Sequence, residues 1–237
     1  MIAPVSDASA FFRAHPVETV AVDALSRTGQ LTLYAEKDVA LLGVYGNAGH
    51  LTLTDGANAA EWRSLIRFLG LSTVTTDAYS ASKLRGYKKA ERVKLLGMGT
   101  PTLSPADEHL VFSPNLRQVH ALLSRYLPVS DADTFVSDMQ LRINHGVGRS
   151  IAYEIDGALV GTASVFFESD TVCFLGGIAT DKAYRGRGIA SMLVSALCRD
   201  ALSKQKRPVL TCVNPAAERV YRSLGFVAVG ERVTLTY

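Results

Sequence analysis

A strand, a glycine turn and a helix that follow one another directly set the strongest constraint on the fold of this chain. Residues 171–180 are apolar and rich in strand-forming residues, and apolar residues recur at helical spacing over residues 186–201. The turn between them contains Arg185, Gly186, Arg187 and Gly188. A strand that leads at once into an amphipathic helix indicates an α/β domain, in which the helix packs on the sheet.

The glycine turn has the properties of an anion-binding site. The first N–H groups of a helix have no partner within the helix and lie at the positive end of its dipole. Glycine at positions 186 and 188 leaves this backbone open to a ligand, and Arg185 and Arg187 add positive charge. We therefore expect the turn to bind a diphosphate, with a tight turn between solvated arginines as the alternative.

The turn does not fit a dinucleotide-binding motif. That motif requires a third glycine, where this chain has Ser191, and an acidic residue at the end of the next strand. Residues 209–213 form the next strand, and Asn214 follows it. We therefore reject a dinucleotide as the ligand.

The pattern before the turn predicts a sheet of mixed direction. Residues 150–155, 158–167 and 171–180 have strand character, and Asp156-Gly157 between the first two is a strong hairpin signal. After the helix the chain reads as a further strand, a helix and a last strand. We expect an α/β fold with a mixed, mostly antiparallel sheet and helices on both faces.

The N-terminal half carries a weak echo of the C-terminal half. Residues 72–99 read as strand, polar break, helix and strand, and residues 208–231 read in the same order. Two prolines and several small polar residues at 99–107 indicate a boundary. We therefore expect two domains, at residues 1–103 and 104–237.

The composition argues against several classes of protein. A net charge of +3 is too small to indicate nucleic-acid binding, and no apolar run approaches the roughly 20 residues that span a bilayer. Cys173, Cys198 and Cys212 lack the spacing of zinc or redox motifs, so we expect three buried thiols, no metal and a reducing, cytoplasmic location. The basic run at 83–94 predicts a solvated face, with a surface for an acidic partner as the alternative.

Two motifs of the C-terminal half together resemble a known family. Residues 185–190, RGRGIA, fit the pattern R/Q-x-x-G-x-G/A, and residues 214–226, NPAAERVYRSLGF, place an asparagine, a helix with tyrosine and Gly-Phe in order. Over residues 107–237 the chain resembles the GNAT superfamily of acyl-CoA-dependent N-acyltransferases. The whole layout is similar to bacterial two-part members, which implies tandem GNAT-like folds with a degenerate N-terminal copy and a catalytic C-terminal one.

The resemblance implies acetyl-CoA as co-substrate and assigns residues to its binding. The amides of the turn would hold the CoA pyrophosphate, and exposed backbone of the preceding strand would pair with the pantetheine arm. Asn214 would bond the pantetheine amides, and Gly176-Gly177 would form a bulge where the sheet splays. The CoA-binding residues expected in this way are Ile178, Ala179, Thr180, Arg185, Gly186, Arg187, Gly188, Ile189, Ala190, Asn214 and Tyr221.

Two residues are candidates for proton transfer. Tyr221 stands where family members often carry the general acid, and a phenol with an ordinary pKa of about 10 is protonated at neutral pH; a tyrosine that braces the helix is the alternative. Many relatives place a glutamate base where this chain has Phe174. Glu168 is the nearest replacement, acting through water, and a solvated turn carboxylate is its alternative; Asp170 and His145 are weaker candidates. Loss of the amine proton to solvent also stays open.

The resemblance implies acetyl transfer to a primary amine by direct attack in a ternary complex. The acceptor would be a small-molecule or peptide amine, with no nucleic acid or membrane as partner and a homodimer left open. Two alternatives remain, a non-catalytic acyl-CoA-binding or regulatory module and an N-acyltransferase that uses a longer acyl-CoA. The missing strand glutamate favours the first alternative, and Tyr221 opposes it.

Overall fold

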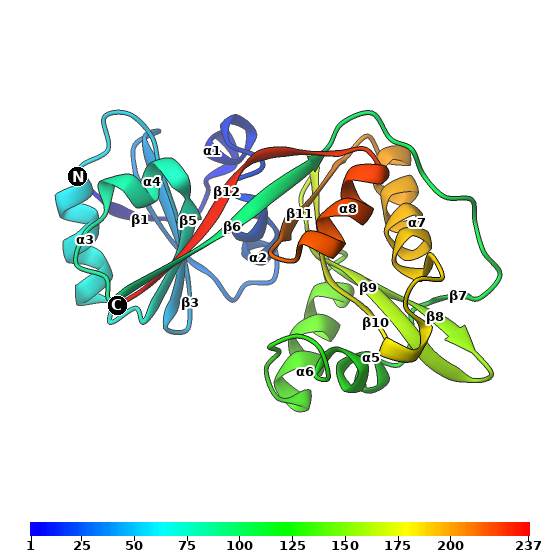
Figure 1. The fold of residues 1–237 in the computed structure, drawn as a ribbon. Helices are drawn as coiled ribbons and strands as arrows, with labels where there is room; N and C mark the ends of the chain where they lie inside the picture. The colour runs from blue at the N-terminus through cyan, green and yellow to red at the C-terminus, as the bar shows by residue number, and fades with distance from the viewer. The chain divides into compact units, whose positions relative to one another are not determined.

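The computed structural model describes every residue from Met1 to Tyr237 and divides the chain into two compact units (Figure 1). The N-terminal unit consists of Met1–Leu95 together with Val229–Tyr237, and the C-terminal unit consists of Leu96–Ala228. Two long strands, β6 (Lys89–Met98) and β12 (Phe226–Thr236), each have residues in both units.

The N-terminal unit is an antiparallel meander that ends in one parallel crossover. β4 pairs in parallel with β5 after helix α3, and β12 then pairs antiparallel with β5 from Arg232↔Asp77 to Thr236↔Thr73. Its elements are β1 (Ala3–Val5), α1 (Ser9–Ala14), α2 (Val20–Ser26), β2 (Thr32–Glu36), β3 (Ala40–Tyr45), β4 (Ala48–Leu53), α3 (Ala59–Phe68), β5 (Thr73–Asp77) and α4 (Ala78–Lys83).

The C-terminal unit repeats this scheme. β8, β9 and β10 form an antiparallel meander, and β11 pairs in parallel with β10 after helix α7. Its elements are β7 (Leu110–Phe112), α5 (Leu116–Leu123), α6 (Ala132–Asn144), β8 (Arg149–Ile155), β9 (Ala158–Glu168), β10 (Val172–Thr180), the 3-10 turn Lys182–Tyr184, α7 (Ile189–Ser203), β11 (Arg207–Cys212) and α8 (Pro215–Ser223). No helix of the structure has the length and apolar character that a membrane crossing requires.

Helices cover both faces of the C-terminal sheet, as the sequence predicts. Val160 and Val165 of β9 pack in a cluster with α7 and α8, whereas Leu159 and Phe166 pack with α5 and α6. Neighbouring residues of a strand point to opposite faces, so the two helix pairs lie on opposite sides of the sheet (Figure 1).

Two local predictions are confirmed. Asp156 (φ 50°) and Gly157 (φ 76°) both have left-handed backbone and close the β8–β9 hairpin. The register of β10 against β9 shifts between Gly176 and Ala179, and Gly177 has a φ of 57°, so this stretch is a bulge. A Cβ atom on Gly176 would overlap with the Phe166 ring, so this backbone position requires glycine.

The predicted internal repeat is also present, because β5–α4–β6 in the first half and β11–α8–β12 in the second half have the same order of elements. The compact units nevertheless differ from the ranges 1–103 and 104–237 in two stretches, because residues 96–103 lie in the C-terminal unit and the end of β12 lies in the N-terminal unit. Val229–Tyr237 lies in the N-terminal unit, where Val233 and Leu235 are fully buried beside Trp62 and Ile66 of α3. A strand pattern in the sequence does not specify which neighbour the strand pairs with.

We predict that the substitution Leu235→Ala destabilises the N-terminal unit by about 2–5 kcal/mol, because it opens a cavity in a closed core. The free energy of unfolding from urea titration is the measurement. The substitution Thr236→Ala on the same strand, at a half-buried position, is the control and costs less than about 1 kcal/mol. Equal stability of the Leu235→Ala variant and the wild type would contradict the placement of β12 in this core.

Candidate active site

Strand β10 has one unpaired edge in its second half. Its parallel pairing with β11 runs only from Val172↔Arg207 to Leu175↔Leu210, and beyond the bulge it pairs with β9 alone. The N–H of Asp181 donates to Val160 of β9 at 2.8 Å. Because backbone groups alternate along a strand, the N–H and C=O groups of Ile178 and Thr180 face the opposite, open edge.

The turn after β10 brings an uncapped helix terminus to the end of this edge. Gly186 (φ 79°) and Gly188 (φ 78°) both have left-handed backbone, and the space where their Cβ atoms would lie is empty. Gly188 is the N-cap of α7, and no side chain caps this helix or places an acidic group in its first turn. The first N–H groups of α7 are therefore free to bind an anion.

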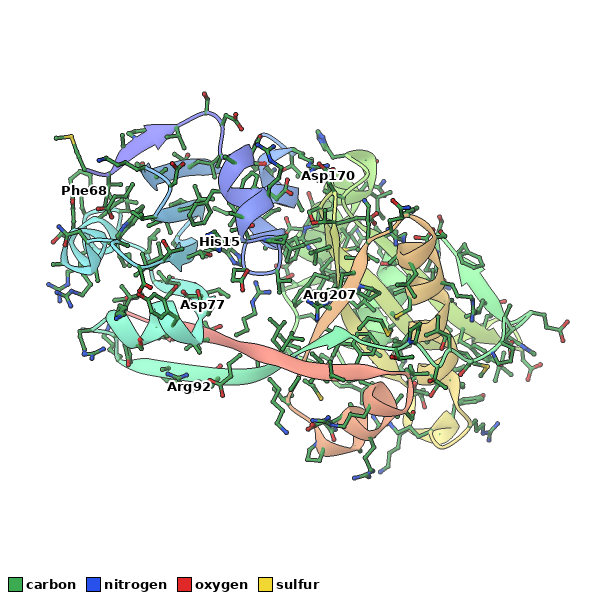
Figure 2. The ribbon with its side chains drawn as sticks, turned by 90° about the horizontal axis from the view of Figure 1, so that it is seen from above. His15, Phe68, Asp77, Arg92, Asp170 and Arg207 are labelled. Atoms are coloured by element: carbon green, nitrogen blue, oxygen red, sulfur yellow. The ribbon has the colours of Figure 1, made fainter.

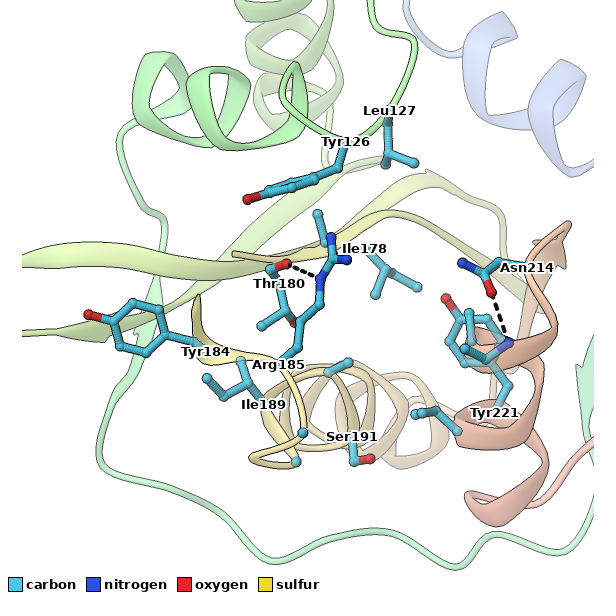
Figure 3. Close-up of a pocket in the computed structure, with 17 residues that line it drawn as sticks. Tyr126, Leu127, Ile178, Thr180, Tyr184, Arg185, Ile189, Ser191, Asn214 and Tyr221 are labelled. Atoms are coloured by element: carbon cyan, nitrogen blue, oxygen red, sulfur yellow. Dashed lines mark hydrogen bonds between the residues drawn. The ribbon is translucent and has the colours of Figure 1, made fainter. Parts of the chain in front are cut away.

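A cavity of about 510 Å³ joins the open edge, the turn and helix α8 (Figure 3). It brings together ten of the eleven residues that the sequence predicts for CoA binding, and the exception is Arg187, whose guanidinium lies 5.1 Å from the centroid of the Tyr184 ring. The lining also contains residues that the sequence did not predict, which are Tyr126, Leu127, Tyr184, Ser191, Ala216, Ala217 and Val220.

Helix α8 supplies two polar groups of the cavity. Asn214 is the N-cap of α8, and its Oδ1 accepts a hydrogen bond from the N–H of Ala216 at 2.8 Å, so its amide NH₂ is free for a ligand (Figure 3). Tyr221 is buried, with its ring edge-on to Phe226 at 6.1 Å. Burial, with the neighbouring Cys212, raises the pKa of Tyr221 above its ordinary value, so the phenol keeps its proton.

Comparison with known proteins agrees with this geometry. Residues 116–226 match the family model described as the acetyltransferase (GNAT) family. Residues 116–226 are a GNAT acetyltransferase domain, and the C-terminal unit that contains them is called the GNAT unit below. None of the curated proteins matches the chain significantly.

Solved structures with this fold cover nearly the whole chain at low identity. A GCN5-related N-acetyltransferase from Kribbella flavida is 16% identical, with a TM-score of 0.66 over 92% of this chain and 94% of that one. An acetyltransferase of the GNAT family from Colwellia psychrerythraea is 12% identical, with a TM-score of 0.61 over 100% and 99%. A tandem GNAT protein from the clavulanic acid biosynthesis pathway is 13% identical, with a TM-score of 0.61 over 100% and 98%. The fold is therefore the tandem GNAT fold.

One orphaned atom of the GNAT unit fits a ligand of the CoA type. The hydroxyl oxygen of Thr180 is buried and has no hydrogen-bond partner, although Thr180 lines the cavity. Buried polar groups without a partner are rare, and an amide-bearing arm along the open edge would supply one. The open edge, the free helix terminus and this hydroxyl together suit pantetheine joined to a pyrophosphate.

The structure does not support Glu168 as the general base. Glu168 pairs with Cys173 across the sheet, and Cys173 is five residues from Ile178, a distance of about 16 Å along β10. The Glu168 carboxylate is buried in ion pairs with Arg149 and with Lys206 Nζ at 2.7 Å. Burial raises the pKa of Glu168, but the hydrogen bonds and charges of Lys206 and Arg149 outweigh it and lower the pKa below its usual value. Glu168 is also not the solvated turn residue of the alternative.

The two weaker candidates lie outside the cavity as well. His145 is the C-cap of α6, and Asp170 lies in the exposed turn between β9 and β10 (Figure 2). The lining of the cavity contains no carboxylate and no imidazole. No group of three or more His, Cys, Asp or Glu side chains is placed to hold a metal ion.

The corresponding edge in the N-terminal unit belongs to β4, beyond its short pairing with β5, and it is already hydrogen-bonded to side chains. Thr76 Oγ1 of β5 donates to the carbonyl of Leu51 at 2.5 Å, and Ser80 Oγ of α4 accepts from the N–H of Leu53 at 2.8 Å. The N-terminus of α3 is capped by Asn58, whose own N–H donates to the buried carboxylate of Glu36 at 3.0 Å. Closed backbone and a nearby negative charge make this edge unsuitable for a diphosphate ligand.

We predict that the substitution Glu168→Gln lowers the stability of the protein by about 3 kcal/mol at pH 7, because Arg149 and Lys206 lose a buried charged partner. Because the folded pKa is lowered, the stability that Glu168 contributes is present above its unfolded pKa and is lost as the pH falls. Urea unfolding at pH 7 and pH 4 should therefore show a smaller acid loss for Glu168→Gln than for the wild type.

The substitution Glu108→Gln, at an exposed position of the same unit, is the control and should change stability by less than about 0.5 kcal/mol. A Glu168→Gln variant with wild-type stability would contradict the assignment of Glu168 to a stabilising ion-pair cluster.

Proposed function

We propose that the GNAT unit transfers an acetyl group from acetyl-CoA to a primary amine by direct attack in a ternary complex. One observation carries the proposal: an unpaired strand edge leads to an uncapped helix N-terminus within one cavity that also contains Tyr221. The family match of residues 116–226 supports acyl transfer as the reaction class.

The open edge and the turn would hold the co-substrate. The backbone groups of Ile178 and Thr180 would bind the amides of the pantetheine arm as an added strand does. The free N–H groups of residues 186–190 and the guanidinium of Arg185 would bind the pyrophosphate. The amide NH₂ of Asn214 lies across the cavity from this edge, where it would bind a pantetheine carbonyl (Figure 3).

Tyr221 would act as the general acid. Acetyl-CoA supplies an activated thioester, and the hydroxyl of Tyr221 would donate its proton to sulfur as negative charge develops there. The pKa of Tyr221 is raised by burial and by Cys212, which favours the protonated phenol that this role requires. Burial raises the pKa of the Cys173 thiol to about 12, which opposes a covalent intermediate at that residue.

The amine would reach the cavity in its neutral form. Because no carboxylate or imidazole lines the cavity, we propose that the acceptor loses its proton to solvent before attack. Phe174, at the position of the glutamate in many relatives, is buried, and its ring centroid lies 6.1 Å from that of Phe167 at an interplanar angle of 51°. The phenylalanine in place of a glutamate favours a second candidate function, a non-catalytic acyl-CoA-binding module. Such a module would bind the co-substrate but acetylate none of the amines in a screen.

We predict that the substitution Gly188→Trp abolishes CoA binding, because the indole fills the empty space in front of the first N–H groups of α7. Calorimetric titration with CoA should show a dissociation constant of order micromolar for the wild type and no binding for the variant. The substitution Gly146→Trp is a matched control, because Gly146 also has left-handed backbone (φ 68°) and empty space but lies after α6, outside the cavity. Equal CoA affinity of Gly188→Trp and the wild type would contradict the pyrophosphate site.

We predict that the substitution Tyr221→Phe lowers kcat by about a hundredfold or more and leaves the affinity for CoA within about twofold, because only the proton donor is removed. Steady-state rates with an amine that the wild type acetylates are the measurement. The wild-type rate should also show no loss at alkaline pH up to about 10, since the pKa of Tyr221 is raised above its ordinary value. A Tyr221→Phe variant with unchanged kcat would leave Tyr221 as a bracing residue.

A further inference from the structure

Tyr126 connects two segments that the sequence leaves unrelated. It lies three residues after α5, and its hydroxyl donates to Asp181 Oδ2 at 3.2 Å and accepts from the N–H of Lys182 at 3.0 Å. The neighbouring Arg125 also pairs with Asp181 Oδ2, at 3.1 Å. The turn after α5 is therefore tied to the start of the loop that leads to the glycine turn.

The ring of Tyr126 makes a second contact, with Arg185 at the other end of the same loop. The guanidinium carbon of Arg185 lies 4.8 Å from the ring centroid, within the range of a cation–π interaction (Figure 3). Arg185 Nε donates to the carbonyl of Thr180 at 3.1 Å. This carbonyl faces the open edge of β10. The guanidinium of Arg185 therefore lies at the end of the edge along which pantetheine would bind.

The remaining donors of Arg185 are free. The guanidinium of Arg185 has no ion pair, and its one hydrogen bond is the bond from Nε to the carbonyl of Thr180. Its two terminal nitrogens can therefore bind a phosphate without breaking an existing interaction. Leu127, directly after Tyr126, lines the same cavity. It belongs to the turn after α5, which consists of residues 124–126 and the irregular segment 127–130.

We propose that Tyr126 is a positioning residue that couples CoA binding to the order of the turn after α5, residues 124–130. The ring of Tyr126 holds the Arg185 guanidinium where the pyrophosphate binds, and the hydroxyl transmits the restraint through Asp181 and Lys182 to the turn after α5. The inference rests on the proposed function, because it takes CoA as the ligand. Coupling of this kind is reciprocal, so an ordered turn also strengthens CoA binding.

The experiment separates the two contacts of Tyr126 with two substitutions in the full chain. Tyr126→Leu removes the ring and the hydroxyl, whereas Tyr126→Phe removes the hydroxyl alone. Tyr79→Leu is the matched control, because Tyr79 also combines a cation–π contact, with Lys83 Nζ at 4.9 Å from the ring centroid, and a hydroxyl that donates to Asp55, but it lies outside the cavity. Calorimetry gives the affinities for CoA and for pantetheine, which lacks the pyrophosphate, and amide hydrogen exchange of residues 125–131 reports the order of the turn.

We expect Tyr126→Leu to weaken CoA binding by roughly three- to thirtyfold and to leave pantetheine binding unchanged, because the lost contact acts on the phosphate ligand Arg185. Tyr126→Phe should weaken CoA binding less than Tyr126→Leu does, because it keeps the ring contact with Arg185 and loses only the coupling to the turn. CoA should slow amide exchange in the turn of the wild type and of Tyr79→Leu, and it should not do so in either Tyr126 variant.

Two results would overturn the inference alone. CoA affinity of Tyr126→Leu equal to that of the wild type, or an equal loss for CoA and pantetheine, would show that the ring does not position Arg185. Protection of the turn by CoA in Tyr126→Phe would show that the hydroxyl does not couple the two segments. A wild type that binds no CoA would instead overturn the proposed function and this inference together.

Discussion

The candidate site depends on one contact between an aromatic ring and bare backbone. Phe166 of β9 lies directly on Gly176 and Gly177 of β10, where a Cβ atom on Gly176 would overlap with the ring. The bulge formed there shifts the register against β9, and the pairing of β10 with β11 does not extend past Leu175. The unpaired edge, the cavity and the position of the glycine turn all follow from this local change in the sheet.

The sequence predicts features of this unit that are encoded over a few residues. Asp156-Gly157 indicates its hairpin, Gly176-Gly177 its bulge and RGRGIA its strand-to-helix turn, because left-handed backbone and strand-to-helix junctions have local residue requirements. The sequence does not predict the partners of Glu168, since Arg149 and Lys206 lie 19 and 38 residues away. The contribution of Tyr126 depends in the same way on long-range packing, as it lies 55 residues from Asp181.

The two units share one topology, but a few polar side chains close the strand edge in the N-terminal unit that is open in the GNAT unit. Both have a parallel pair of strands after a crossover helix, where an edge can open. In the N-terminal unit Thr76 and Ser80 take up the backbone groups of β4, and Glu36 places a carboxylate near the start of α3. In the GNAT unit no strand pairs with this edge of β10 beyond Leu175, so a difference in hydrogen bonding separates an open edge from a closed one.

The placement of β12 has a consequence for how the chain is made. A ribosome synthesises the N-terminal unit first, yet the strand that covers β5 and contributes Val233 and Leu235 to its core follows the whole GNAT unit in the chain. The edge of β5 therefore stays unpaired during synthesis, and exposed strand edges are prone to wrong pairing. The unit that begins first is the last to be completed, and a single cut between the halves would leave each with an incomplete sheet.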